Sequence, residues 1–278
     1  MSAAAPAPAA RGAYSVSGRA VRLGAVSYLN AEPHVWGLED DPGFRVERDL
    51  PSRVARRLHA GEVDLGIIPS IEYAFGPYAI VPDVAIGSCG PVLSVCLFHR
   101  GPLERVRRVA LDTSSRTSVA LARVLLRARL GRDPQYVPMG PGLVDMLAVA
   151  DAALMIGDPA LDQEGDVLRL DLGQEWLRVT GLPFVFAFWA GRAGSVNPAG
   201  VRRLQAALCS GRAQLDAIAE RQARGVPGRA ERYRAYLREN IVFELGEAEQ
   251  AGLREFYRRA HGLGLIPAVP ELRFHGEA

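Results

Sequence analysis

The sequence contains no lysine, only three cysteines and no long apolar run, and each of these shortages excludes a class of protein. All 33 basic residues are arginine, but 31 acidic residues reduce the net charge to +2, so we expect no nucleic-acid-binding surface. Cys89, Cys96 and Cys209 are odd in number and lack paired metal-ligand spacing, which argues against a disulfide framework and a zinc site. No run of about eighteen apolar residues occurs, so we expect no membrane insertion.

Familiar catalytic patterns are missing as well. The five histidines are isolated, without a pair four residues apart or an accompanying glutamate motif, so we expect no metal and no cofactor. No G-x-S-x-G nucleophile elbow and no Cys/His pairing context occurs. If the protein is an enzyme, we expect it to act by positioning and polarity rather than through a strong nucleophile.

The first twenty residues are small and rich in alanine and proline. They lack a charged start followed by a strongly apolar core, so we expect a flexible tail over residues 1–20 and no secretion signal. The unpaired cysteines suit a reducing compartment, and we therefore expect a cytoplasmic location.

From Val21 onwards the sequence alternates strand-like and helix-like segments, which is typical of an α/β protein with mostly parallel sheets. Strands are predicted at 108–112 and 135–139, and amphipathic helix over almost all of 197–261. Two very apolar strands, 92–100 and 183–191, bracket about ninety residues, and we interpret them as crossings between two lobes. The predicted first lobe is 21–97 plus 190–278, the inserted second lobe is 98–189, and a ligand cleft lies between them.

The segment DTSSRTS, 112–118, has five hydroxyl side chains and one arginine where a strand ends and a helix begins at Thr117. The first turn of a helix presents unpaired N–H groups and a partial positive charge, so it stabilises an anion. Ordinary capping accounts for only one or two of the hydroxyls. Because no glycine-rich phosphate loop is present, a carboxylate is the expected anion. The candidate ligand-binding residues here are Ser114, Ser115, Arg116, Thr117 and Ser118.

Three further segments follow predicted strands. In VSYLNAEP, Asn30 offers a donor and an acceptor at the sheet edge where α/β proteins hold ligands, although it is also a common turn residue before proline. In AIGSCGPV, Ser88 lies between glycines that let the backbone approach a ligand. In ALMIGDPAL, Asp158 follows a buried strand, and capping of the next helix is its simplest role.

These segments resemble the chorismate dehydratases of the futalosine route to menaquinone. The matching motifs are SYLNAEP, GEVDLGIIPSIEY, GSCGPVLSVCLF, DTSSRTSVALARVLL and LMIGDPAL, in this order and at similar spacing. They span Val21 to Ala190 and cover about half of the chain. A related dihydroxynaphthoate synthase of the same route has a different opening motif and lacks SRTS, so the resemblance favours the dehydratase.

The resemblance implies a type II periplasmic-binding-protein-like fold, with two α/β lobes, a central ligand cleft and two interdomain crossings. It implies the dehydration of chorismate to 3-enolpyruvylbenzoate plus water, with chorismate as the small-molecule partner. Asn30 and Ser88 are the implied catalytic contacts. Substrate-binding residues are expected among Ser27, Tyr28, Ser114, Ser115, Arg116, Thr117, Ser118 and Asp158. The sequence departs from the family at His34, where an aliphatic residue is commoner, and at Cys89, where a polar residue such as Asp is common.

The implied reaction needs little chemical help because loss of water makes the substrate ring aromatic. A helix N-terminus that stabilises charge on the ring carboxylate would act preferentially in the transition state. No histidine emerges as the base. The substrate's own enolpyruvyl carboxylate, Glu72 and Asp158 remain open as proton acceptors.

Two other classes share this fold. A solute-binding protein would also direct a helix N-terminus at a carboxylate, and fold alone does not separate a receptor from an enzyme. A transcription-factor effector domain is disfavoured, because no helix-turn-helix segment precedes the fold in this sequence. The SYLNAEP and SRTS motifs together favour the enzyme.

Overall fold

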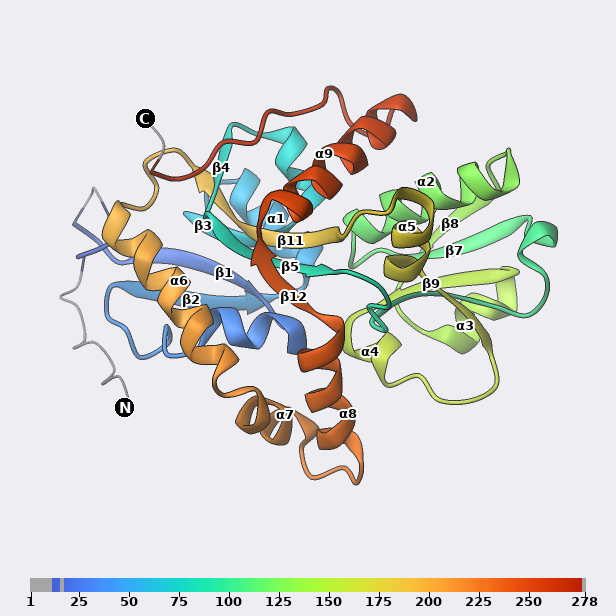
Figure 1. The fold of residues 1–278 in the computed structure, drawn as a ribbon, viewed down its shortest axis with the longest axis horizontal. Coiled ribbons are helices and arrows are strands. Elements are labelled where there is room, and N and C mark those ends of the chain that lie inside the picture. The colour runs from blue at the N-terminus through green and yellow to red at the C-terminus, as the bar shows by residue number, and fades with distance from the viewer. Residues whose placement is uncertain (1–11, 16–17, 277–278) are drawn as a thin grey trace.

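The computed structural model describes residues 12–15 and 18–276, and it contains two β-sheets side by side with helices packed around both (Figure 1). The first sheet has the strand order β12-β5-β11-β3-β1-β2, with β4 beside β11. The second has the order β10-β6-β9-β7-β8. The α/β fold class predicted from the sequence is confirmed.

The strands of the first sheet are β1 (Val21–Val26), β2 (Phe44–Asp49), β3 (Leu65–Pro69), β4 (Tyr78–Ile80), β5 (Asp83–Ser88), β11 (Phe184–Arg192) and β12 (Val242–Leu245). Those of the second are β6 (Val95–His99), β7 (Arg108–Asp112), β8 (Gln135–Met139), β9 (Ala152–Ile156) and β10 (Leu168–Asp171). The α-helices are α1 (Pro51–His59), α2 (Thr117–Leu130), α3 (Leu143–Val149), α4 (Gly157–Leu161), α5 (Leu172–Thr180), α6 (Pro198–Arg212), α7 (Leu215–Ala223), α8 (Arg229–Ala235) and α9 (Glu247–Gly262). Short helical turns are η1 (Leu29–Val35), η2 (Ser70–Phe75), η3 (Leu103–Arg105) and the π-helical η4 (Tyr236–Asn240).

Both sheets are mixed rather than mostly parallel. β1 runs parallel to β2 and β3, and β7 runs parallel to β8 and β9. β11 is antiparallel to β3 and β5, and β6 is antiparallel to β9. The inner strands β3 and β9 are buried along their whole length, which explains their continuous apolar sequences.

Neither of the two apolar strands interpreted as crossings passes between the sheets. In the part of the chain that the structure describes, β6 pairs only within the second sheet and β11 only within the first, so the chain crosses instead through residues 89–94 and 172–183. Asp171 forms hydrogen bonds with both crossings. Its carboxylate caps α5 by accepting from the Gln174 N–H at 3.0 Å, and it also accepts from the N–H groups of Val92 at 3.0 Å and Leu93 at 2.6 Å. The lobe boundaries named above stay a prediction.

The C-terminal region contains a strand and a π-helical turn that the sequence pattern did not predict. Within 197–261, η4 and the four-residue strand β12 interrupt the helices, and β12 pairs with β5 in the first sheet. A strand this short has too few alternating positions to stand out from helical periodicity.

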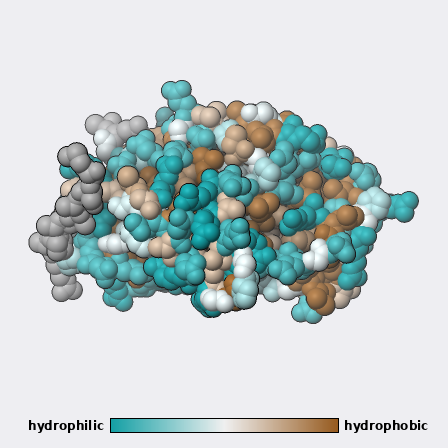
Figure 2. Space-filling model, turned by 60° about the horizontal axis from the view of Figure 1, so that its bottom comes forward, coloured by the Kyte–Doolittle hydropathy of each residue, from teal (hydrophilic) through white to brown (hydrophobic). Residues whose placement is uncertain are grey.

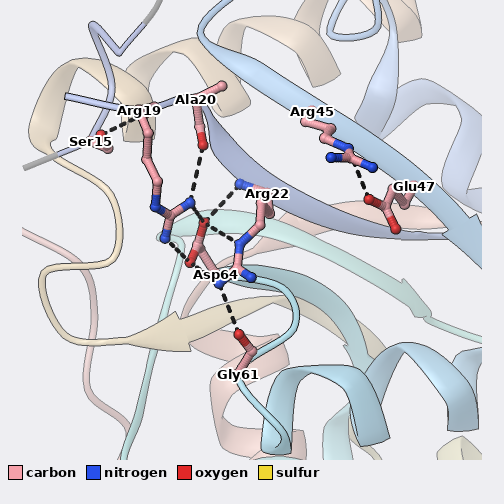
Figure 3. A network of polar contacts seen from close by, with 8 residues as sticks. All are labelled: Ser15, Arg19, Ala20, Arg22, Arg45, Glu47, Gly61 and Asp64. Atoms are coloured by element: carbon pink, nitrogen blue, oxygen red, sulfur yellow. Dashed lines mark hydrogen bonds and ion pairs between the residues drawn. The ribbon is translucent and has the colours of Figure 1, made fainter. Parts of the chain in front are cut away.

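The predicted flexible tail falls partly outside the described residues, at 1–11 and 16–17. Of the rest, Tyr14 is buried, stacks on Phe44 with ring centroids 4.5 Å apart, and donates a hydrogen bond to Asp41 at 3.1 Å. Arg19 and Arg22 both bind Asp64, as Figure 3 shows. The chain before β1 is thus attached to the first sheet at two places.

The surface is mainly hydrophilic on the face shown in Figure 2, with hydrophobic residues gathered toward the half that holds the second sheet. Val144 and Val149 of α3 are among the exposed apolar side chains. In the part of the chain that the structure describes, no helix has the length and apolar character needed to span a membrane.

The Arg19–Arg22–Asp64 cluster gives a stability prediction. Burial raises the pKa of Asp64, but the hydrogen bonds from Arg19 and Arg22 outweigh it and hold that pKa well below 3.8. The carboxylate therefore contributes stability that is present above about pH 4 and is lost as the pH falls through the native pKa. We expect Asp64→Asn to lower the free energy of unfolding by about 2 kcal/mol at pH 7, and by progressively less below pH 4.

Urea denaturation at several pH values measures this difference. Arg45→Gln is the control, because Arg45 is exposed and forms a surface ion pair with Glu47 (Figure 3), so we expect a change below about 0.5 kcal/mol. A loss for Asp64→Asn that is independent of pH would contradict the assignment.

Candidate active site

A narrow cavity lies between the two sheets, where η1 follows β1, α2 follows β7 and α4 follows β9. Its wall includes the apolar side chains of Ile86, Ile156 and Phe186. The polar residues that line it are Tyr28, Asn30, Ser94, Ser115, Thr117 and Ser118. A small number of polar groups in an apolar wall is typical of a small-molecule site.

The cavity is small in this conformation, at about 50 Å³. On this measure a water molecule needs roughly 10–15 Å³, so the cavity has room for a few water molecules. The volume lies below the roughly 300–1,000 Å³ that is typical of small-molecule pockets.

The start of α2 has the helix boundary predicted from DTSSRTS, at Thr117. Asp112 accepts a hydrogen bond from the Ser114 N–H at 2.8 Å, and this shapes the turn that enters the helix. Ser115 accepts from the Ser118 N–H at 3.2 Å, which is the ordinary capping role. One of the predicted hydroxyls is thus a cap, while Ser115 and Ser118 also reach the cavity wall.

Tyr28 and Ser114 form one of the contacts between the two sides of the cavity. Their hydroxyls lie 3.3 Å apart, and burial raises the pKa of Tyr28, which keeps its hydroxyl protonated. The ring of Tyr28 covers Gly157, where a Cβ would lie 2.7 Å from the ring and where φ is +66°. Only glycine suits that position, because of both the backbone conformation and the close ring.

Two further contacts across the cavity are made by Asp158 with Leu29 and by Thr117 with Ile71. Asp158 accepts from the Leu29 N–H at 3.0 Å, and the Thr117 hydroxyl accepts from the Ile71 N–H at 3.1 Å. Asp158 lies inside α4 and makes no side-chain cap, so the capping role expected for it is wrong. Tyr28, Ser114, Thr117 and Asp158 are therefore engaged in holding the two sides together.

The side chain of Arg116 is partly exposed to solvent and also pairs with a buried carboxylate. Its guanidinium lies 3.0 Å from Glu72, and the other Glu72 oxygen lies 2.7 Å from the His59 Nε2. Glu72 is buried and lies outside the central cavity, in the wall of a neighbouring one. Arg116 thus forms an ion pair between α2 and η2, and Glu72 is occupied by two partners.

Asn30 lies in η1, in the first helical turn after β1, and lines the cavity. Its side chain does not bind its own backbone as a turn residue would. The Nδ2 group donates to the Tyr236 hydroxyl at 3.1 Å, and that hydroxyl lies 2.8 Å from the Ser94 Oγ. Ser94 and Tyr236 are both buried, and the sequence pattern singled out neither.

Ser88 and Ser27 do not line the cavity. Ser88 is buried at the end of β5 and faces Gly173, where a Cβ would lie 2.5 Å from its Oγ. Ser27 is exposed and its hydroxyl donates to the Asp49 carbonyl at 3.3 Å. The serine that reaches the cavity from the predicted GSCGPVLSVCLF motif is Ser94, six residues after Ser88.

The two departures from the family pattern lie apart from the cavity. His34 is buried in η1, and burial lowers its pKa to about 4, so it is neutral at pH 7. Cys89 is exposed in the first crossing. Among the described residues, no group of three His, Cys, Asp or Glu side chains is placed to hold a metal ion.

Comparison with known proteins places the chain among enzymes of one pathway. The pattern of a family described as "Menaquinone biosynthesis" matches residues 21–262. A chorismate dehydratase of Thermus thermophilus is 36% identical over 89% of this chain and 96% of that protein. A chorismate dehydratase of Campylobacter jejuni is 31% identical over 59% of this chain and 65% of that protein. A 1,4-dihydroxy-6-naphtoate synthase of Streptomyces coelicolor is 26% identical over 80% of this chain and 83% of that protein.

Solved structures share the fold at low sequence identity. A protein of Archaeoglobus fulgidus superposes with a TM-score of 0.69 at 17% identity, covering 88% of this chain and 98% of that one. The periplasmic aliphatic sulphonate binding protein SsuA of Escherichia coli gives a TM-score of 0.62 at 18% identity, covering 90% of this chain and 94% of that one. The predicted periplasmic-binding-protein-like fold is confirmed.

Asp158 provides a test of the cavity electrostatics. Burial raises its pKa from 3.8 to about 6, with further increases from Asp162 and Glu32. Between about pH 4 and pH 6 the native state retains a proton that the unfolded chain has lost, so stability falls as the pH rises through this window. At pH 7 the buried charge costs up to about 3 kcal/mol.

We expect Asp158→Asn to be more stable than the parent protein at pH 7, because an amide oxygen still accepts the Leu29 N–H without a buried charge. The advantage should disappear below about pH 4. Thermal unfolding followed across this pH range measures it, with the exposed Asp166→Asn as the matched control. Lower stability of Asp158→Asn at pH 7 would show that the charge itself is required.

Proposed function

The chain belongs to the menaquinone biosynthesis family, and we propose that it acts as a cytoplasmic hydro-lyase that converts chorismate into 3-enolpyruvylbenzoate and water. The observation that carries the proposal is the polar lining of the central cavity, which combines a helix start with the side chains of Asn30 and Ser94. The similarity to chorismate dehydratases over most of the chain supports the choice of substrate.

The proposed reaction breaks a C–H and a C–O bond of the ring. The substrate's enolpyruvyl carboxylate takes the proton from the carbon that carries the enolpyruvyl ether and passes it to the neighbouring hydroxyl, which departs as water, and the ring becomes aromatic. As the proton leaves, negative charge spreads into the ring carboxylate. The start of α2, with Ser115 and Ser118 in the cavity wall, stabilises this charge more strongly in the transition state than in the bound substrate.

The proton acceptor in this proposal is the substrate's own enolpyruvyl carboxylate. Glu72 is bound by Arg116 and His59 and lies outside the cavity. Asp158 lies beside the cavity-lining Gly157, but its carboxylate accepts a hydrogen bond from Leu29. Neither protein carboxylate is therefore available to the ring in this conformation, and Asp158 becomes the protein alternative once the two sides separate.

Substrate entry requires an open conformation. Opening breaks the contacts of Tyr28, Thr117 and Asp158 across the cavity and frees their polar groups. These are residues for which the sequence predicts substrate binding. In this proposal they bind the substrate in the open protein and then hold the closed one together.

Two alternatives remain to be tested directly. A dihydroxynaphthoate-type synthase is supported only by the lower identity to the Streptomyces coelicolor enzyme. A carboxylate receptor is supported by the shared fold alone. Incubating the purified protein with chorismate separates them: we expect a new aromatic absorbance and a product lighter by one water. Binding of chorismate without conversion would favour the receptor.

Asn30 is the residue on which the proposed chemistry depends most. We expect Asn30→Ala to lower kcat by about 100-fold and to change KM by less than about threefold, because the amide acts on the departing hydroxyl more than on ground-state binding. Steady-state kinetics with chorismate measure both constants. Gln163→Ala, at a partly exposed loop position outside the cavity, is the control. Unchanged turnover by a folded Asn30→Ala protein would remove Asn30 from the mechanism.

A further inference from the structure

We propose that Tyr236 is a positioning residue that determines which hydrogen-bonding atoms of Asn30 and Ser94 face the cavity. Tyr236 is fully buried, does not line the cavity, and is joined through one hydroxyl to two residues that do. This inference rests on the proposed function, because its main readout is turnover of chorismate.

The direction of the two hydrogen bonds follows from the chemistry of the groups. The Asn30 Nδ2 only donates, so the Tyr236 oxygen accepts from it at 3.1 Å. The Tyr236 hydrogen then needs an acceptor, and the Ser94 Oγ lies 2.8 Å away. A buried hydroxyl that did not use this acceptor would leave its hydrogen unpaired, at a cost of about 1–3 kcal/mol.

This direction assigns a polarity to the cavity. Because Ser94 accepts from Tyr236, its own hydrogen is free to donate to a bound carboxylate or hydroxyl. Because Asn30 uses one N–H on Tyr236, its carbonyl oxygen remains as an acceptor and its second N–H as a donor. With this direction the Ser94 hydroxyl keeps its hydrogen for a ligand, whereas in the reversed chain of hydrogen bonds Ser94 would donate to Tyr236 and offer a ligand only its oxygen.

Tyr236 is held in place from both ends of its helical turn. It begins the π-helix η4 directly after α8, and such turns occur frequently at functional sites. At the other end, the Asn240 side chain donates to the Pro91 carbonyl at 2.9 Å, which fixes the turn to the first crossing, close to Ser94 in sequence. Burial also raises the pKa of Tyr236, so the hydroxyl remains protonated and able to donate at pH 7.

Tyr236→Phe tests the inference, since it removes one oxygen and keeps the ring. We expect kcat to fall by about 10- to 100-fold with KM changed by less than about threefold, because misplaced groups act mainly on the transition state. Combined with Asn30→Ala, the loss should be far less than the product of the two single losses. Tyr233→Phe is the control: Tyr233 is buried three residues away and its hydroxyl binds Asp162, outside the cavity, so kcat should stay within about twofold.

The outcomes separate the two proposals. If the parent protein does not convert chorismate, the proposed function fails whatever the variants do. If the parent protein converts chorismate while Tyr236→Phe retains its kcat, the positioning role is overturned and the proposed function stands. A parallel fall of kcat in Tyr236→Phe and Tyr233→Phe would show a general packing effect and would also overturn it.

Discussion

The architecture depends on one carboxylate at the point where the chain passes between its two sheets. Asp171 accepts hydrogen bonds from Val92 and Leu93 of the first crossing, 89–94, and from Gln174 at the start of α5 in the second, 172–183. The two crossings are therefore fixed to each other by this one carboxylate. The contact between Tyr28 and Ser114 across the cavity involves neither of these crossings.

The hydroxyl-rich start of α2 both forms structural hydrogen bonds and lines the cavity. Ser115 caps the helix, and Thr117 joins it to the opposite side of the cavity. The same segment still presents serine side chains and the positive end of the helix to the cavity. A carboxylate bound there would lie beside groups that these hydrogen bonds already hold in place, so its charge would be stabilised with little rearrangement.

Much of the fold was predictable because the decisive signals are local. β7 and β8 have the bounds expected from 108–112 and 135–139, and α2 begins at Thr117 as predicted. The short strand β12 and the location of the crossings were not predictable, since both depend on pairing between distant segments. The cavity lining follows the same rule: Asn30 was singled out from its local motif and lines the cavity, whereas Tyr236 lies 142 residues from Ser94 in sequence and is placed beside it only by the fold. Ser88 and Ser94 belong to one motif, and only the structure shows which of them reaches the cavity.

The ion pair between Arg116 and Glu72 is asymmetric in its exposure. Glu72 is enclosed, with 2% of its side chain exposed, while Arg116 remains 54% exposed. Dissolved anions therefore compete for the guanidinium but dissolved cations have little access to the carboxylate. Ionic strength therefore acts mainly on the guanidinium end of this contact.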